Sequence, residues 1–96
     1  MAADELWMSA SYRRATVGMH FTWRPVQEAV TEVLVDLERA LAPLAARPHW
    51  GKLFVAGAAE IAPLYERHGD FVRLVERLDP RGAFRNAWLE RHVLGS

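Results

Sequence analysis

Apolar and polar side chains alternate along residues 16–24, and this period of two is typical of a β-strand with one apolar and one polar face. The apolar positions are Val17, Met19, Phe21 and Trp23. His20 and Thr22 lie between them and therefore point in the same direction. This polar face either meets water or forms part of a binding site.

The next segment has the period of an α-helix. Pro25 suits the first turn, because its φ is fixed and it has no N–H group to leave unpaired. The polar side of the helix includes Glu38, and Pro43 and Pro48 mark its end. Its apolar residues recur at spacings of three and four, which predicts an amphipathic helix of about five turns: Val26, Val30, Val33, Leu34, Leu37, Leu41 and Leu44.

The motif RPHWGKLF at residues 47–54 is short and apolar at its end, and we interpret it as a second strand. A strand, a helix and a strand in this order form a right-handed β-α-β unit with parallel strands. The carboxyl ends of such strands meet at one edge of a sheet. His20 and Thr22, near the end of the first strand, are therefore expected to approach Lys52, near the end of the second.

The second half of the chain has helical patterns only. Residues 59–67 predict a short helix with Pro63 in its first turn, and residues 71–78 predict another helix that follows Asp70 as its N-cap. Residues 79–82, with the sequence DPRG, have the composition of a turn, and residues 84–94 predict a terminal helical segment. The predicted fold class is therefore α+β: a β-α-β piece of a sheet followed by C-terminal helices.

Composition excludes several classes of function. Twelve acidic and twelve basic residues cancel, so the chain lacks the concentrated basic field that nucleic acid or an anionic membrane surface requires. It has no cysteine for a disulfide or a thiolate metal site, and its four histidines lack a metal-ligand spacing. No apolar run approaches the roughly 20 residues of a membrane span, and Asp4 and Glu5 are acidic where a signal peptide would be basic. We therefore expect one soluble, cytoplasmic domain.

Lys52 is the only lysine of the 96 residues, and every other basic side chain except the histidines is an arginine. Since arginine serves wherever plain positive charge suffices, the single lysine indicates a need for a compact, rotatable ammonium. The alternative is a solvated lysine without a function. With His49, Trp50 and Gly51 beside it, Lys52 is typical of the wall of a small polar pocket, and together with His20 and Thr22 this set can hold a hydroxyl-rich substrate.

Three motifs carry a resemblance to a known family: HFTW at residues 20–23, RPHWGKLF at residues 47–54 and LDPRGAFRNAWLER at residues 78–91. In order and spacing they resemble the C-terminal portion of the alditol (xylitol) oxidases, which belong with the D-arabinono-1,4-lactone and L-gulonolactone oxidases in the vanillyl-alcohol oxidase class of flavoproteins. The resemblance implies an FAD-dependent oxidoreductase. Such an enzyme transfers a hydride from a carbinol carbon of a polyol, such as xylitol or sorbitol, or of a sugar lactone to the flavin, and oxygen then gives hydrogen peroxide.

The resemblance also implies roles for individual residues. His20, Thr22 and Lys52 match positions that bind the hydroxyls of the polyol, and His49 matches a position near the flavin. The flavin-binding domain of the family, its histidine that bonds FAD covalently and its catalytic Glu-x-Arg motif are expected upstream of Met1. No catalytic residue is therefore assigned to this chain.

We accordingly expect residues 1–96 to be a C-terminal fragment, which combines part of the substrate (cap) domain with a C-terminal helical segment. FAD would be bound mainly by the absent N-terminal domain, so the fragment alone is expected to be inactive. Strand edges and apolar faces left open should make it self-associate. A rival interpretation is a free-standing interaction module without catalysis, whose docking surface contains Trp7, Trp50 and Trp88.

Overall fold

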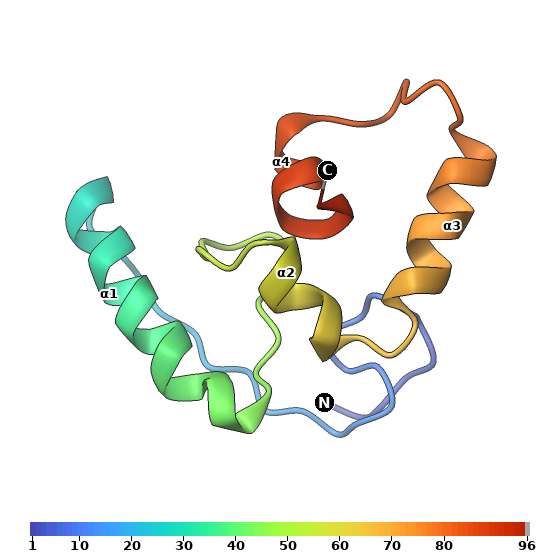
Figure 1. The fold of residues 1–96 in the computed structure, drawn as a ribbon. Coiled ribbons are helices and arrows are strands. Elements are labelled where there is room, and N and C mark those ends of the chain that lie inside the picture. Colours follow the sequence, from blue (N-terminus) through green and yellow to red (C-terminus); the bar gives the residue numbers. More distant parts are fainter. Residues whose placement is uncertain (96) are drawn as a thin grey trace.

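The computed structural model describes residues 1–95, and these form helices joined by long loops (Figure 1). Helix α1 flanks one side of the molecule and α3 the other, with α2 and α4 between them. No helix in this part of the chain combines the length and the apolar character that a membrane crossing requires. The elements in chain order are α1 (Gln27–Leu41), η1 (Ala42–Leu44), α2 (Ala58–Ile61), η2 (Ala62–Leu64), α3 (His68–Leu78), α4 (Ala87–Leu89) and η3 (Glu90–Leu94).

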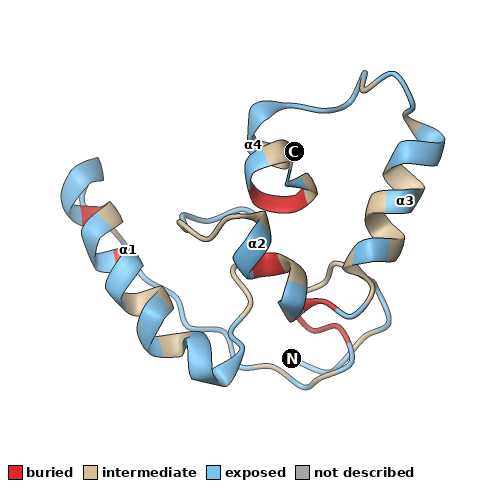
Figure 2. Cartoon of the chain, viewed as in Figure 1, coloured by how far each residue is buried: buried red, intermediate tan, exposed pale blue. Residues whose placement is uncertain are grey.

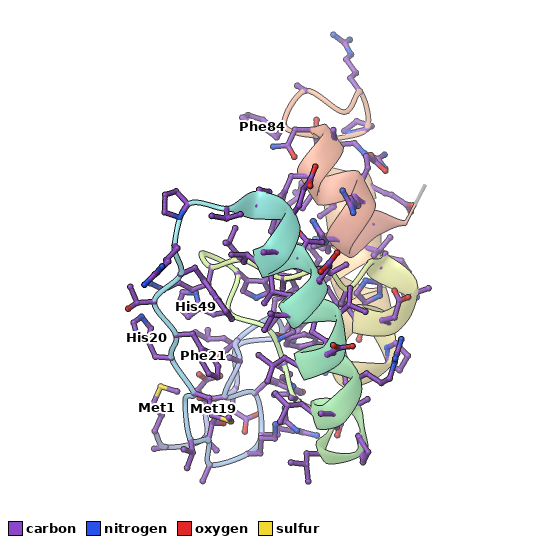
Figure 3. The ribbon with its side chains drawn as sticks, turned by 90° about the vertical axis from the view of Figure 1, so that its left-hand side faces the viewer. Met1, Met19, His20, Phe21, His49 and Phe84 are labelled. Atoms are coloured by element: carbon purple, nitrogen blue, oxygen red, sulfur yellow. The ribbon has the colours of Figure 1, made fainter. Side chains whose placement is uncertain are left out.

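The predicted strands at residues 16–24 and 47–54 do not form in the described chain, so the prediction of a β-α-β unit is wrong for residues 1–95. Residues 16–24 run as an open coil beside α1 (Figures 1 and 3). Backbone groups of residues 17–23 make no hydrogen bond to other backbone groups within residues 1–95. Alternation alone cannot make a strand, because its N–H and C=O groups need a second strand as partner. The apolar side chains consequently remain in solvent, with Val17 89% and Met19 62% exposed.

The prediction of the long amphipathic helix is confirmed. Helix α1 begins at Gln27, two residues after Pro25, and passes into the 3-10 turn η1. Val30 and Leu34 are its buried residues, one turn apart on the same face. Ala45 then ends the helical path with a left-handed backbone, at a φ of 50°.

The shorter helices form, with boundaries that differ from those predicted. Helix α2 is only four residues long, and Pro63 lies in the 3-10 turn that follows it. Helix α3 begins at His68, so Asp70 is a first-turn residue and not the N-cap. Its carboxylate accepts hydrogen bonds from the guanidinium groups of Arg67 and Arg73. A carboxylate in the first turn is also favoured by the helix dipole, which explains its place inside the helix.

The turn predicted at residues 79–82 is confirmed. The Gly82 N–H group donates to the Asp79 carbonyl at 3.1 Å, and Gly82 has a φ of 70° that favours glycine. The Asp79 carboxylate accepts the backbone N–H groups of Ala83 at 2.7 Å and Phe84 at 2.9 Å. The DPRGAF sequence is therefore explained by turn chemistry.

The terminal segment is helical from residue 87 onward. The side chain of Asn86 caps α4 by accepting a backbone N–H group at 2.8 Å. Two histidines then hold this segment to the rest of the chain: His92 Nδ1 lies 2.7 Å from the Ala56 carbonyl oxygen, and His68 Nε2 lies 2.7 Å from that of Val93. These bonds join α3 and the loop before α2 to the C-terminal turn.

The interior consists of small buried groups and not of one continuous layer (Figure 2). The radius of gyration is 14.4 Å, whereas about 12.5 Å is expected for a domain of this length. The accessible surface is 7096 Å², whereas roughly 5,600 Å² is expected for this mass. The described chain is thus loosely built and leaves much surface uncovered. Its buried apolar residues are Tyr12, Val30, Leu34, Ile61, Tyr65 and Val93.

Candidate functional site

The HWGK motif forms a tight turn and not the end of a strand. The Lys52 N–H group donates to the His49 carbonyl at 3.0 Å, and the Gly51 N–H group donates to His49 Nδ1, also at 3.0 Å. Because Nδ1 accepts, the proton of the neutral imidazole lies on Nε2. A Cβ atom at Gly51 would lie 3.3 Å from Cε1 of the exposed His49 ring, so a larger residue here would require the ring to shift slightly.

Trp50 anchors this turn to the body of the molecule. Its indole N–H group donates to the Met8 carbonyl at 2.7 Å, and its ring stacks on Tyr65 with 5.7 Å between ring centroids. His49 and Lys52, on either side of Trp50 and Gly51, are exposed. The turn therefore fixes one aromatic side chain inside and presents an imidazole and an ammonium to solvent. Since Trp50 is half-buried and bonded, it is not available for the docking surface of the rival interpretation.

Arg47, which the sequence analysis did not single out, fastens the chain before the turn. Its Nε donates to the Leu64 carbonyl at 2.9 Å, and its Nη1 donates to the carbonyls of Tyr12 at 2.8 Å and Ala10 at 3.2 Å. Its guanidinium carbon also lies 4.8 Å from the centroid of the Tyr65 ring. One side chain thus joins two loops that are distant in the sequence. In the sequence, the only signal for Arg47 was its position at the start of the RPHWGKLF motif.

Burial affects the titration of two groups in this region. It raises the pKa of the Tyr65 hydroxyl, whose oxygen has no hydrogen-bond partner within residues 1–95. It also lowers the pKa of Arg47, and the positive charge of Arg14 adds to this effect. The guanidinium nevertheless stays charged near neutral pH, because its ordinary pKa lies above about 12.

A second long-range contact that sequence patterns missed comes from Glu38 in α1. Its carboxylate accepts the backbone N–H groups of Val55 and Ala56, each at 2.8 Å. The helical period had placed Glu38 on the solvent side, but its side chain is half-buried. This contact fixes Val55 and Ala56, which follow Lys52, to α1. The coil that carries His20 and Thr22 leads into the same helix. No local signal reveals it, since the partners are 17 and 18 residues away.

The structure places His20 and Thr22 on the open coil and Lys52 on the HWGK turn, all three exposed. Figure 3 shows His20, Phe21 and His49 on the same side of the molecule. Within residues 1–95 no hydrogen bond or ion pair engages the side chains of the three predicted substrate-binding residues. The described chain therefore presents these groups without enclosing them.

Two surface hollows beside α3 are lined by residues other than His20, Thr22 and Lys52. One of ≈ 410 Å³ is lined by residues of the N-terminal loop together with Phe71 and Leu74, and a second of ≈ 240 Å³ lies beside Trp7 and three arginines. Neither contains His49, which is exposed. Neither of these hollows would therefore place a flavin against His49.

The chain belongs to the D-arabinono-1,4-lactone oxidase (ALO) family, whose model matches residues 1–92, and the predicted family resemblance is thereby confirmed. Alditol oxidase of a Streptomyces species is 46% identical over 89 residues, which are 93% of this chain and 21% of that protein. L-Gulono-1,4-lactone dehydrogenase of Mycobacterium tuberculosis is 33% identical over 102 residues, covering 98% of this chain and 22% of that protein.

A shorter match relates part of the chain to a long-chain alcohol oxidase of an uncultured marine euryarchaeote. It is 46% identical over 43 residues, which are 45% of this chain and 9% of that protein. All three relatives are named as oxidoreductases, so the chain is part of an oxidoreductase family. It spans about a fifth of the length of the alditol oxidase and of the lactone dehydrogenase that it matches.

Proposed function

We propose that this chain is the C-terminal part of a longer FAD-dependent oxidoreductase, which oxidises a polyol similar to xylitol or sorbitol, or a sugar lactone, with oxygen as acceptor and hydrogen peroxide as product. The identity of 46% to an alditol oxidase over 93% of the chain carries this proposal. The large accessible surface supports it, because a chain that packs against further domains leaves such surface open when it is considered alone. The missing part would include the flavin-binding domain.

In this proposal His20, Thr22 and Lys52 bind the hydroxyl groups of the substrate. Their exposure and lack of side-chain partners within residues 1–95 support the assignment, since their donors are available to a ligand. An imidazole, a hydroxyl and an ammonium differ in geometry and charge, so together they can orient a chain of hydroxyl groups. The flavin, when bound, would accept the hydride, and His49 is proposed to contact it through Nε2–H.

We also propose that residues 16–24 become a strand of a cap-domain sheet in the longer protein. Their alternating side chains and their unpaired backbone support this, because both suit an added strand. Pairing would satisfy the backbone groups, and packing of the sheet would cover the apolar face and leave the His20 and Thr22 side chains on the other. Residues 47–54, in contrast, contain the HWGK turn and are not proposed as a regular strand.

The experiment compares two proteins: the 96-residue chain, and a longer protein expressed from the gene extended upstream of Met1. Each is incubated with FAD and with xylitol, sorbitol or sugar lactones, while flavin absorbance and peroxide are followed. We expect the longer protein to bind FAD and turn over at least one of these substrates, and the chain alone to do neither. Turnover by the chain alone would falsify the fragment hypothesis. A longer protein that binds no flavin or oxidises none of these compounds would overturn the proposed function.

A further inference from the structure

Glu38 is the contact through which helix α1 holds the segment that follows Lys52. Residues 53–56 make no backbone-to-backbone hydrogen bond within residues 1–95. The Val55 and Ala56 N–H groups instead donate to the two carboxylate oxygens of Glu38, each at 2.8 Å. Hydrogen bonds to an ionised acceptor are roughly twice as strong as those between neutral groups. The Ala56 carbonyl is in addition bonded to His92, so Glu38 is the contact that fixes this segment against α1.

The position of Lys52 depends on this contact because few bonds separate them. Only two residues lie between Lys52 and Val55, so the lysine Cα cannot lie farther than about 11 Å from that of Val55. On the other side of the turn, Trp50 is fixed by its hydrogen bond to Met8. Phe54, which follows the turn, also contacts the rings of Trp88 and His92, and Glu38 provides the hydrogen bonds that come from α1.

Helix α1 is also the element that connects directly to the other proposed binding residues. His20 and Thr22 lie on the coil that runs beside α1 and enters it through Pro25 (Figure 3). Helix α1 carries this coil at its start and holds the Lys52 segment through Glu38, so it links the two groups of residues. We propose that Glu38 is a positioning residue, which sets the distance of the Lys52 ammonium from His20 and Thr22 and thereby the affinity for a hydroxyl-rich substrate. This inference rests on the proposed function.

The contact itself can be tested in the 96-residue chain without any activity. Hydrogen–deuterium exchange of residues 53–57 is compared in the wild type, Glu38→Ala, Glu38→Gln and Glu32→Ala. Glu32 is the matched control, because it is an exposed acidic residue of the same helix. We expect exchange about tenfold faster in Glu38→Ala and an intermediate rate in Glu38→Gln, whose side chain keeps one acceptor oxygen. Unchanged exchange in Glu38→Ala overturns the inference.

The positioning role is tested in the longer protein by a double-mutant cycle between Glu38 and Lys52. We expect Glu38→Ala to raise KM for xylitol about tenfold while kcat changes less than about twofold, since a binding group is misplaced. In a Lys52→Ala background, the same change should raise KM less than about twofold further, because the group that Glu38 positions is gone. Glu32→Ala should leave KM unchanged.

The outcomes separate this inference from the proposed function. In one outcome the longer protein oxidises xylitol and Lys52→Ala impairs it, but Glu38→Ala has the same effect on KM with and without Lys52. The positioning role is then overturned and the proposed function stands. If the wild-type longer protein oxidises no polyol or lactone, both fall. A lower melting temperature of Glu38→Ala without any change in KM shows a purely structural role and also overturns the inference.

Discussion

Tyr65 combines a packed ring with a hydroxyl that lacks a partner. The ring stacks on Trp50 and lies under the guanidinium of Arg47, while the hydroxyl oxygen is buried without a hydrogen bond inside residues 1–95. A buried polar group without a partner costs about 1–3 kcal/mol. We expect Tyr65→Phe to keep both ring contacts and to raise the free energy of unfolding by about 1 kcal/mol. Thermal melts measure this, and a clear loss of stability in Tyr65→Phe would show that the hydroxyl has a partner after all.

The Lys52 ammonium gives the sharpest test of the proposed substrate site. If it donates to a substrate hydroxyl, Lys52→Ala in the longer protein removes about 1.5–3 kcal/mol of interaction, the range for charged hydrogen bonds. This corresponds to a loss of roughly ten- to a hundredfold or more in kcat/KM for xylitol and sorbitol. Lys52→Arg should rescue only part of the loss, because the guanidinium is larger and its donors have a fixed orientation.

A solvated lysine without a function leads to a different result. Both Lys52 variants would then keep wild-type kinetics, and their stability would change by no more than about 0.5 kcal/mol, as is usual at exposed positions. A thermal melt of each variant excludes unfolding as the cause of lost activity. Unchanged kcat/KM in Lys52→Ala would remove this residue from the substrate site.

Helix α3 carries a charge cluster whose contribution depends on pH. Hydrogen bonds from Arg73 and then from Arg67 lower the pKa of the Asp70 carboxyl from its ordinary value. A carboxyl with a lowered folded-state pKa stabilises the fold fully above its unfolded pKa, about 3.9, and this contribution is lost as the pH falls through the folded pKa. We therefore expect Asp70→Asn to lower stability at neutral pH and to weaken the loss of stability in acid.

Thermal melts of the wild type and Asp70→Asn between about pH 2 and pH 7 check this pH dependence. Glu76→Gln is the matched control, since Glu76 is an exposed carboxylate of the same helix. The melting temperatures of the wild type and of Asp70→Asn should differ at neutral pH and converge in acid. A constant difference at every pH would mean that the charge of Asp70 makes no contribution.

In this chain the apolar sequence pattern predicted the long helix well, whereas the alternating pattern predicted a strand that does not form within residues 1–95. The hydrogen bonds of a helix connect residues four apart, so the apolar period of α1 was sufficient to predict it. The alternation at residues 16–24 predicted a strand, but a strand requires a partner that residues 1–95 do not supply. In the candidate site, His20, Thr22, His49 and Lys52 are predicted from local motifs and stay predictions. Arg47 and Glu38 were not predicted, because their partners are distant in the sequence.

The molecule as a whole exposes about 1,500 Å² more surface than its mass predicts. A stable interface buries about 800 Å² on each partner, so the excess is sufficient for one or two contacts. The open backbone and apolar face of residues 16–24 suit edge-to-edge pairing between two copies. We expect the isolated chain to form dimers or larger assemblies at high concentration, as measured by light scattering.

A pair of substitutions locates this association. Val17→Lys places a charge on the exposed apolar face of the coil and should shift the chain towards the monomer. Leu78→Lys changes a leucine at the end of α3 that is 70% exposed, against 89% for Val17, and should leave the assembly intact. A monodisperse wild-type monomer of about 11 kDa without dye-binding apolar surface would contradict the expectation of self-association.

The three carbonyl contacts of Arg47 also set the order in which the chain can assemble during its synthesis. Residues 10 and 12 leave the ribosome long before Arg47 and Leu64, yet the same guanidinium holds all of them in place. Residues 10 and 12 are therefore made before the side chain and the segment that fix them. A nascent chain arrested before Leu64 will therefore offer this loop to proteases, whereas the completed chain will protect it.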